Sequence, residues 1–233
     1  MTLTMDLAIA THRWQGWQDC VASWNDHATG KHLNFIVEHL PVLEAYQIVY
    51  EQTGSDIIAH VHDDVMIYEY GWDERVLRQF DDPKVGLVGF AGALGHGRPD
   101  MYDPPYEIAK MVRLHFMSNM RTAEQHGHRF TGESDVAVLD GLALFVRREI
   151  LDLWDGWPLD EPYGFWMYSE ALCCETRRQG YRIRVVGVDC DHLGGKTSSV
   201  ANVQDSYEDA HRWFWEQNRD VMPFDVTTGV VVD

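Results

Sequence analysis

SDIIAHVHDDVMI, at positions 55–67, is the stretch that decides the fold. Its first part has the period-two pattern of a strand buried on both faces. One face carries Ile57, Ala59 and Val61, and the other carries Ile58, His60 and His62. Two adjacent carboxylates, Asp63 and Asp64, follow directly. Two aspartates are expensive to bury unless positive charge neutralises them. The stretch therefore predicts either a divalent-cation site that holds a phosphorylated ligand or a solvated turn that caps a helix.

The residues before this stretch alternate between strand and helix patterns. Strands are expected at 7–10, 33–37 and 57–62, and helices at 14–24 and from Pro41 to the Thr53-Gly54 pair. This strand–helix–strand–helix–strand order is typical of an α/β fold. Ligands collect at the carboxyl ends of strands in such sheets, so polar residues at those ends are site candidates.

The remaining chain continues the pattern with less regularity. Helices are predicted at 71–80, 106–120, 147–153, 166–179 and 206–218, and strands at 85–90, 136–146 (interrupted by Asp140-Gly141) and 181–188. Loops are predicted at 91–105, 124–134 and 189–196, and an irregular tail follows the last helix. No internal repeat or linker is apparent, so we expect one domain.

The composition excludes several classes of protein. The chain has 233 residues and a formal net charge of −18, a field that repels phosphate backbones and anionic lipid. Its four cysteines form no CxxC pair, which favours a reducing compartment and argues against a zinc knuckle. The sequence lacks a signal-peptide pattern and any run of about 20 apolar residues. We therefore expect a cytoplasmic protein without a membrane-spanning segment.

Four segments together resemble the inverting glycosyltransferases of family 2, which have the GT-A fold. They are IAHVHDDV at 58–65, LDGLALFVRR at 139–148, LDEPYGFWMYSEALCCETRRQG at 159–180 and DHLGG at 191–195. The resemblance implies a single GT-A domain over residues 1–233, with a Rossmann-like, mixed but mostly parallel sheet flanked by helices. Its nucleotide-binding half would cover about 1–90 and its acceptor-binding half about 91–200, followed by a C-terminal helix and tail at 201–233.

The same resemblance implies a nucleotide-sugar donor, with UDP preferred, and a Mn²⁺ or Mg²⁺ cofactor. Asp64 and His192 correspond to metal ligands, although His62 stands where the family has its first acidic residue. The donor nucleotide would contact Thr11, Arg13, Glu38, His62, Asp63 and Lys196. The acceptor would contact Asp140, Gly141 and Trp166. Alternatively, His192 is a surface-loop histidine and Lys196 a solvated lysine.

The general base departs from the family pattern. An inverting transfer needs a carboxylate that deprotonates the acceptor hydroxyl. Ser169 and Ala171 occupy the positions where the family has aspartates, so Glu170 between them is the predicted base, with Asp160 and Glu161 as rivals. Glu170 is equally compatible with a first-turn residue that complements the helix dipole.

Two other functions therefore stay open at this stage: a non-catalytic nucleotide-sugar or carbohydrate binder, and a nucleotidyltransferase. The acceptor is also open among a glycan, a lipid-linked sugar, a protein, a small molecule and a modified nucleobase. The sequence does not indicate the oligomeric state.

Overall fold

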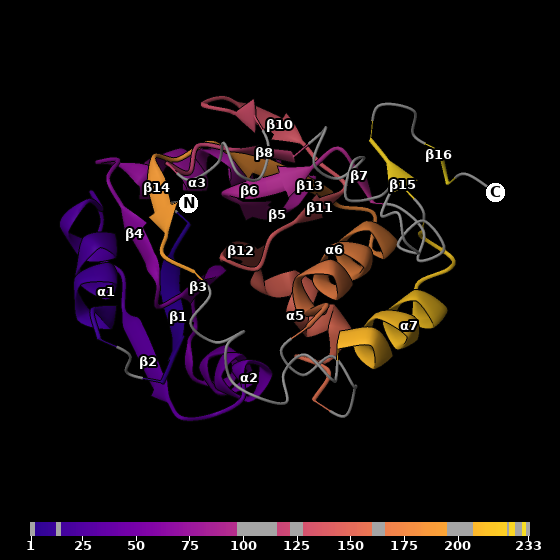
Figure 1. Ribbon diagram of the computed structural model, residues 1–233, viewed down its shortest axis with the longest axis horizontal. Helices are drawn as coiled ribbons and strands as arrows, with labels where there is room; N and C mark the ends of the chain where they lie inside the picture. The colour runs from indigo at the N-terminus through magenta and orange to yellow at the C-terminus, as the bar shows by residue number, and fades with distance from the viewer. Residues whose placement is uncertain are drawn as a thin grey trace.

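A seven-stranded mixed sheet forms the centre of the molecule (Figure 1). The computed structural model describes residues 3–12, 15–96, 116–121, 128–159, 166–194, 207–222, 224–226 and 230–231. The strand order is β10-β13-β5-β12-β3-β1-β2. These strands are β1 (Met5–Thr11), β2 (Asn34–Glu38), β3 (Ile57–His62), β5 (Val85–Gly89), β10 (Glu133–Asp135), β12 (Ala143–Arg147) and β13 (Arg182–Val186). All run in the same direction except β10 and β12. The predicted mixed, mostly parallel sheet is confirmed.

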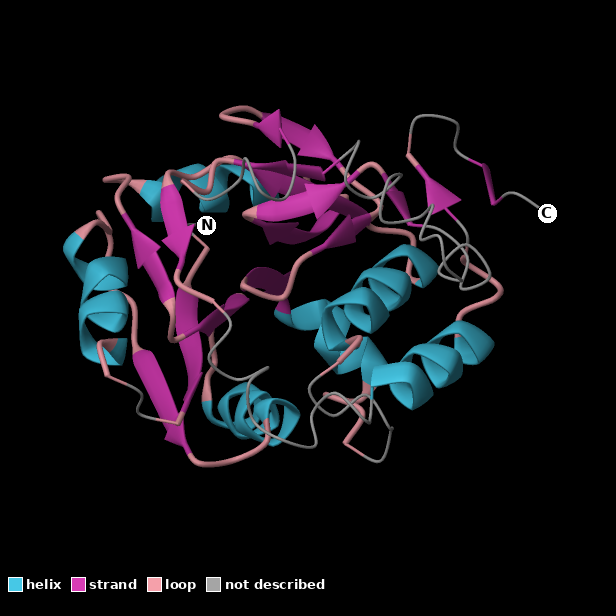
Figure 2. Ribbon diagram, viewed as in Figure 1, coloured by secondary structure: helices cyan, strands magenta, loops and turns pink. Residues whose placement is uncertain are grey.

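Helices cover both faces of this sheet (Figure 2). The helices are α1 (Trp17–Asp26), α2 (Val42–Gln52), α3 (Trp72–Leu77), α5 (Arg148–Trp154), α6 (Tyr168–Arg178) and α7 (Tyr207–Gln217), and the 3₁₀ helix η1 (Arg78–Asp81) follows α3. Side chains of α1 and α3 share one core cluster with Ile57, Ala59 and Val61 of β3. Side chains of α2, α5 and α6 share the other cluster with Ile58. The period-two pattern of β3 thus places its alternate residues in two separate cores.

Three smaller sheets complete the structure. Four strands, β11 (Val138–Leu139), β6 (Ala91–Ala93), β8 (Phe116–Ser118) and β9 (His128–Arg129), form one of them. Three strands, β16 (Val230–Val231), β15 (Phe224–Asp225) and β7 (Gly95–His96), form another. The third is a two-stranded ribbon of β14 (Cys190–His192) and β4 (Val65–Ile67).

Several local predictions were wrong, and all of them involve these short strands or the edge strand β10. The loops predicted at 91–105, 124–134 and 189–196 contain β6 and β7, β9 and β10, and β14. The end of the helix predicted at 106–120 is β8, and the tail predicted as irregular contains β15 and β16. Strands of two or three residues are too short to show a period, and their partners lie far away in the sequence. The break at Asp140-Gly141 was correct, because it separates β11 from β12.

The four cysteines are free and buried. Among the helices of the described residues, none has the length and apolar character needed to cross a membrane.

Asp73, in α3, ties the connection between α1 and β2 to the core. Its side chain is 1% exposed and accepts hydrogen bonds from the backbone N–H groups of Thr29 (3.0 Å) and Gly30 (2.7 Å) and from His32 Nε2 (2.9 Å). Burial raises the pKa of Asp73, but the hydrogen bonds outweigh burial and hold the pKa well below its ordinary value.

We expect Asp73→Ala to lower the free energy of unfolding by about 3 kcal/mol at pH 7, because these donors and the Thr29 hydroxyl lose their buried acceptor. A carboxylate with a depressed pKa stabilises the fold above its unfolded pKa of 3.8 and less as the pH falls through its folded value. The loss should therefore shrink below pH 4. Urea denaturation measures this loss of stability. The control is Glu74→Ala, which substitutes the exposed residue next to Asp73. Equal stability of the two variants would contradict this role of Asp73.

Candidate metal and donor site

The carboxyl ends of β1, β2 and β3 meet at one edge of the central sheet. Thr11 pairs in register with Glu38, and Ala10 pairs with His62. Thr11, Glu38 and His62, which the sequence predicted as donor-binding residues, therefore end three adjacent parallel strands. Thr11 is buried, and Glu38 and His62 are partly exposed.

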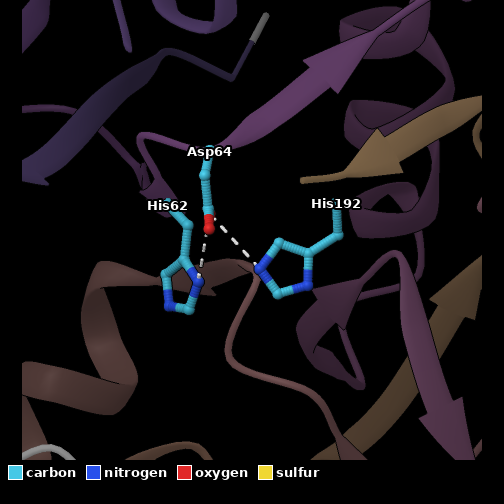
Figure 3. A group of neighbouring side chains, drawn as sticks. All are labelled: His62, Asp64 and His192. Carbon is cyan, nitrogen blue, oxygen red and sulfur yellow. Dashed lines mark ion pairs between the residues drawn. The ribbon is translucent and has the colours of Figure 1, made fainter. Parts of the chain in front are cut away.

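Asp64 lies in the turn that joins β3 to β4, and the β4–β14 ribbon brings His192 to it. In this antiparallel ribbon His192 is opposite Val65, and the Leu193 N–H donates to the Asp64 carbonyl (2.9 Å). The Asp64 Oδ1 atom lies 3.2 Å from His192 Nε2 and 3.9 Å from His62 Nδ1. Figure 3 shows the three side chains pointing toward one another, His62 and Asp64 from the end of β3 and the turn after it, and His192 from β14. The segment predicted as a loop thus supplies His192 from a strand.

The three side chains differ in their preferred charge. Burial raises the pKa of Asp64, but the close approach and charge of His192 outweigh burial and lower it. Burial lowers the pKa of His192, but Asp64 outweighs burial and raises it. The pKa of His62 is lowered by burial and by its histidine neighbour. The cluster therefore combines the ionised carboxylate of Asp64 with the neutral imidazole of His62, while His192 binds a proton more readily than an ordinary histidine.

This donor set fits a divalent metal ion. One ligand atom from each of His62, Asp64 and His192 lies within 4.8 Å of the others. Two imidazoles and a carboxylate are common metal ligands, and the imidazoles suit transition-metal ions better than Mg²⁺. Sequence reasoning assigned His62 to the donor nucleotide, whereas the structure places it in the same cluster as Asp64 and His192.

Helix α6 approaches this cluster with its N-terminus. Met167, which precedes the helix, has a positive φ of 63°. The hydroxyl of Tyr168, in the first turn, lies 2.7 Å from His62 Nε2 and 3.3 Å from the carbonyl oxygen of Gly141. No sequence signal indicated Tyr168, because its contacts join residues from three separate segments.

The predicted base lies two positions further along this turn. Glu170 accepts a hydrogen bond from the Ser169 hydroxyl (2.8 Å). Burial raises the pKa of Glu170, and the charge of Asp140 raises it further. Asp140 is exposed in the turn between β11 and β12, and its charge also acts on His62 and His192. Asp140 therefore acts electrostatically on Glu170 and on both histidines of the cluster.

The other predicted site residues that the structure describes differ in exposure and in their position in the chain. Asp63 is partly exposed beside Asp64, Gly141 is buried, and Trp166 is partly buried just before α6. Four candidates lie outside the described residues: Arg13, Asp160, Glu161 and Lys196.

Comparison with known proteins yields one family and a set of similar folds. Residues 30–218 match a family described as "Glycosyltransferase like family". The mannosyltransferase PcManGT from Pyrobaculum calidifontis, solved with GDP-Man and Mn²⁺, has a TM-score of 0.54 and 13% identity over 84% of this chain and 58% of its own. GalNAc-T7, solved with UDP, GalNAc and Mn²⁺, has a TM-score of 0.56 and 10% identity over 82% of this chain and 44% of its own. This chain thus spans about half the length of these two structures. No curated protein sequence matches.

Proposed function

We propose that this chain, which belongs to the glycosyltransferase-like family and has the GT-A fold, is an enzyme that transfers a sugar from a nucleotide-sugar donor, preferably a UDP-sugar, to an acceptor hydroxyl with inversion. The observation that carries the proposal is the cluster of His62, Asp64 and His192 at the carboxyl edge of the sheet. The free cysteines favour a reducing compartment, so we propose a cytoplasmic location.

The donor would lie along the carboxyl edge of β1, β2 and β3. Thr11 and Glu38 end two adjacent strands there and are placed to contact the nucleoside. Asp63, next to the cluster, would face the ribose or a phosphate. Arg13 is a further proposed nucleoside contact, as the family resemblance implies, and Lys196 is a proposed phosphate contact.

Asp64 and His192 would hold the metal ion, and His62 is the proposed third ligand. The bound ion would supply positive charge to the diphosphate as its leaving-group charge develops. Since two of the three ligands are imidazoles, we propose Mn²⁺ in preference to Mg²⁺.

Glu170 is the proposed base. Its carboxylate would take the proton of the acceptor hydroxyl while the acceptor oxygen forms a bond to the anomeric carbon. The bond from that carbon to the phosphate oxygen breaks, and the nucleoside diphosphate leaves with the electron pair. Asp140 is exposed near Glu170 and is placed to orient the acceptor. Gly141 and Trp166 are the other proposed acceptor contacts.

Calorimetric titration of UDP tests the metal-dependent donor site. We expect Mn²⁺ to tighten UDP binding at least about tenfold over a chelator control, and Mg²⁺ to tighten it less, because imidazole nitrogens are poor ligands for Mg²⁺. GDP in the same series tests the preference for UDP. Nucleotide affinity that is unchanged by any divalent ion would overturn the proposal. A screen of nucleotide sugars that measures released nucleoside diphosphate would then identify the donor sugar.

A further inference from the structure

The hydroxyl of Tyr168 contacts two polar groups. The side chain is 4% exposed, and its oxygen lies near His62 Nε2 (2.7 Å) and the Gly141 carbonyl oxygen (3.3 Å). Tyr168 has a single proton to donate among these neighbours.

The hydrogen-bonding capacities of these groups leave one arrangement that satisfies all of them. A carbonyl oxygen has no hydrogen, so the Tyr168 O–H must donate to Gly141. The Tyr168 oxygen then accepts from His62 Nε2–H. A neutral imidazole with its proton on Nε2 has a lone pair on Nδ1. The tautomer of His62 is therefore fixed by a residue on a different element.

The orientation of Nδ1 agrees with this assignment. His62 Nδ1 lies 3.9 Å from Asp64 Oδ1, which is too long for a hydrogen bond. A proton on Nδ1 would therefore have no good acceptor in Asp64, and the Gly141 carbonyl would lose its donor. Two acceptor atoms at this spacing suit a cation between them, since metal bonds to such ligands are about 2.0–2.2 Å long.

Gly141 makes the space that Tyr168 occupies. A Cβ atom at this position would lie 2.4 Å from the Tyr168 oxygen and 2.8 Å from Cζ, both far inside contact distance. The backbone of Gly141 does not have a positive φ, so its conformation does not require glycine. The requirement is room for the tyrosine hydroxyl.

The ring of Tyr168 is also held firmly. It packs edge-on against Trp157 (centroids 6.2 Å apart) and Tyr46 (6.1 Å apart). The residue before it, Met167, has a strained positive φ that sets where the first turn of α6 begins. These contacts hold the Tyr168 hydroxyl in place where it bonds to the imidazole of His62.

We propose that Tyr168 is a positioning residue of the metal site: by accepting the Nε2–H of His62, it directs the Nδ1 lone pair toward Asp64 and makes His62 a metal ligand beside Asp64 and His192. This inference rests on the proposed function, because it concerns the metal ion proposed there. The sequence predicted Gly141 as an acceptor contact, and its lack of a side chain also leaves the space that the Tyr168 hydroxyl occupies. Removing the hydrogen-bond partner of a metal-binding histidine commonly weakens metal binding by about 10- to 100-fold.

Titration of the purified protein with Mn²⁺, followed by the electron paramagnetic resonance signal of the free ion, tests the proposal. Tyr168→Phe keeps the ring and removes the hydroxyl, and should weaken Mn²⁺ binding by about 10- to 100-fold. The control is Tyr50→Phe, which removes a hydroxyl that bonds to Asp152 on the surface and should leave Mn²⁺ affinity unchanged. Equal affinity of Tyr168→Phe and the wild type would overturn the proposal.

Nitrogen NMR of the metal-free wild-type protein gives an independent readout. We expect the long-range ¹H–¹⁵N pattern of His62 to show the proton on Nε2, and a proton on Nδ1 would overturn the proposal even if Tyr168→Phe does not fold. The two proposals fail differently. Absence of Mn²⁺ binding by the wild type defeats the metal site in both, whereas Mn²⁺-dependent transfer with equal affinity in Tyr168→Phe defeats only the role of Tyr168.

Discussion

Asp64→Asn is expected to abolish the effect of Mn²⁺ on nucleotide binding and to lower the rate of sugar transfer by about 10³-fold, equivalent to roughly 4 kcal/mol of transition-state stabilisation. Asp64 is the carboxylate of the cluster, and both His62 and His192 face its Oδ1 atom. The amide has the same shape but lacks the negative charge that a divalent ion requires. Titration of UDP with and without Mn²⁺ measures the binding effect, and release of nucleoside diphosphate measures the rate.

Asp191→Asn is the matched control. Asp191 precedes His192 in β14, so its side chain points to the opposite side of the strand. The substitution removes the same charge close to the site but leaves all three side chains of the cluster in place, and we expect transfer to change less than about threefold. Metal-dependent UDP binding that survives in Asp64→Asn would contradict the role of Asp64, whatever the control shows.

Glu170→Gln should lower turnover by about 10²- to 10⁴-fold while UDP binding stays unchanged, because the base acts on the acceptor and has no contact with the nucleotide in our proposal. The wild-type rate should also fall with decreasing pH. Since burial raises the pKa of Glu170, this fall should begin above the pH at which an ordinary glutamate is protonated. The measurements are turnover at saturating donor and the pH dependence of the rate.

The same substitution should stabilise the protein at pH 7. A carboxyl group whose folded pKa is raised contributes its full stability below its unfolded pKa, near 4.5, and loses it as the pH rises through the folded value. Glutamine is neutral at every pH, so the melting temperature of Glu170→Gln should exceed that of the wild type at pH 7, and the difference should shrink toward pH 4.

Glu175→Gln serves as the control on the same helix. Glu175 pairs with Arg178 at the other end of α6 and should affect neither turnover nor its pH dependence. If Glu170→Gln retains wild-type turnover, the base lies elsewhere, and Asp160 and Glu161 become the candidates to substitute next.

The sequence was sufficient for the parts of the fold in which the signal is local. The alternation in β3 and the helical spacing in α1 and α2 are set by which residues face each core, so the first five elements and the two faces of β3 were predicted correctly. The α/β class and the GT-A fold followed from the order of these elements and four motifs. The division into two functional halves stays a prediction.

The site was predictable only where a motif marked it. Asp64 and His192 were both predicted as metal ligands from the family resemblance, and the structure places Asp64 Oδ1 3.2 Å from His192 Nε2. The contact of His62 with Tyr168 was not predictable, because it depends on how α6 docks against the end of β3. The β4–β14 ribbon was missed for the same reason: each strand has three residues, and only their pairing makes them strands.

Because of the β4–β14 ribbon, metal binding requires a large part of the chain to be folded. Asp64 and His192 are separated by more than half of the chain, and closing so long a loop requires the intervening strands to be in place. A chain that ends before β14 would contain Asp64 without its imidazole partner from that strand, so an incomplete chain should bind Mn²⁺ weakly. In the 233-residue chain, any ion that binds only the assembled ribbon must stabilise the native state by mass action, so Mn²⁺ should raise the melting temperature in proportion to the logarithm of its concentration.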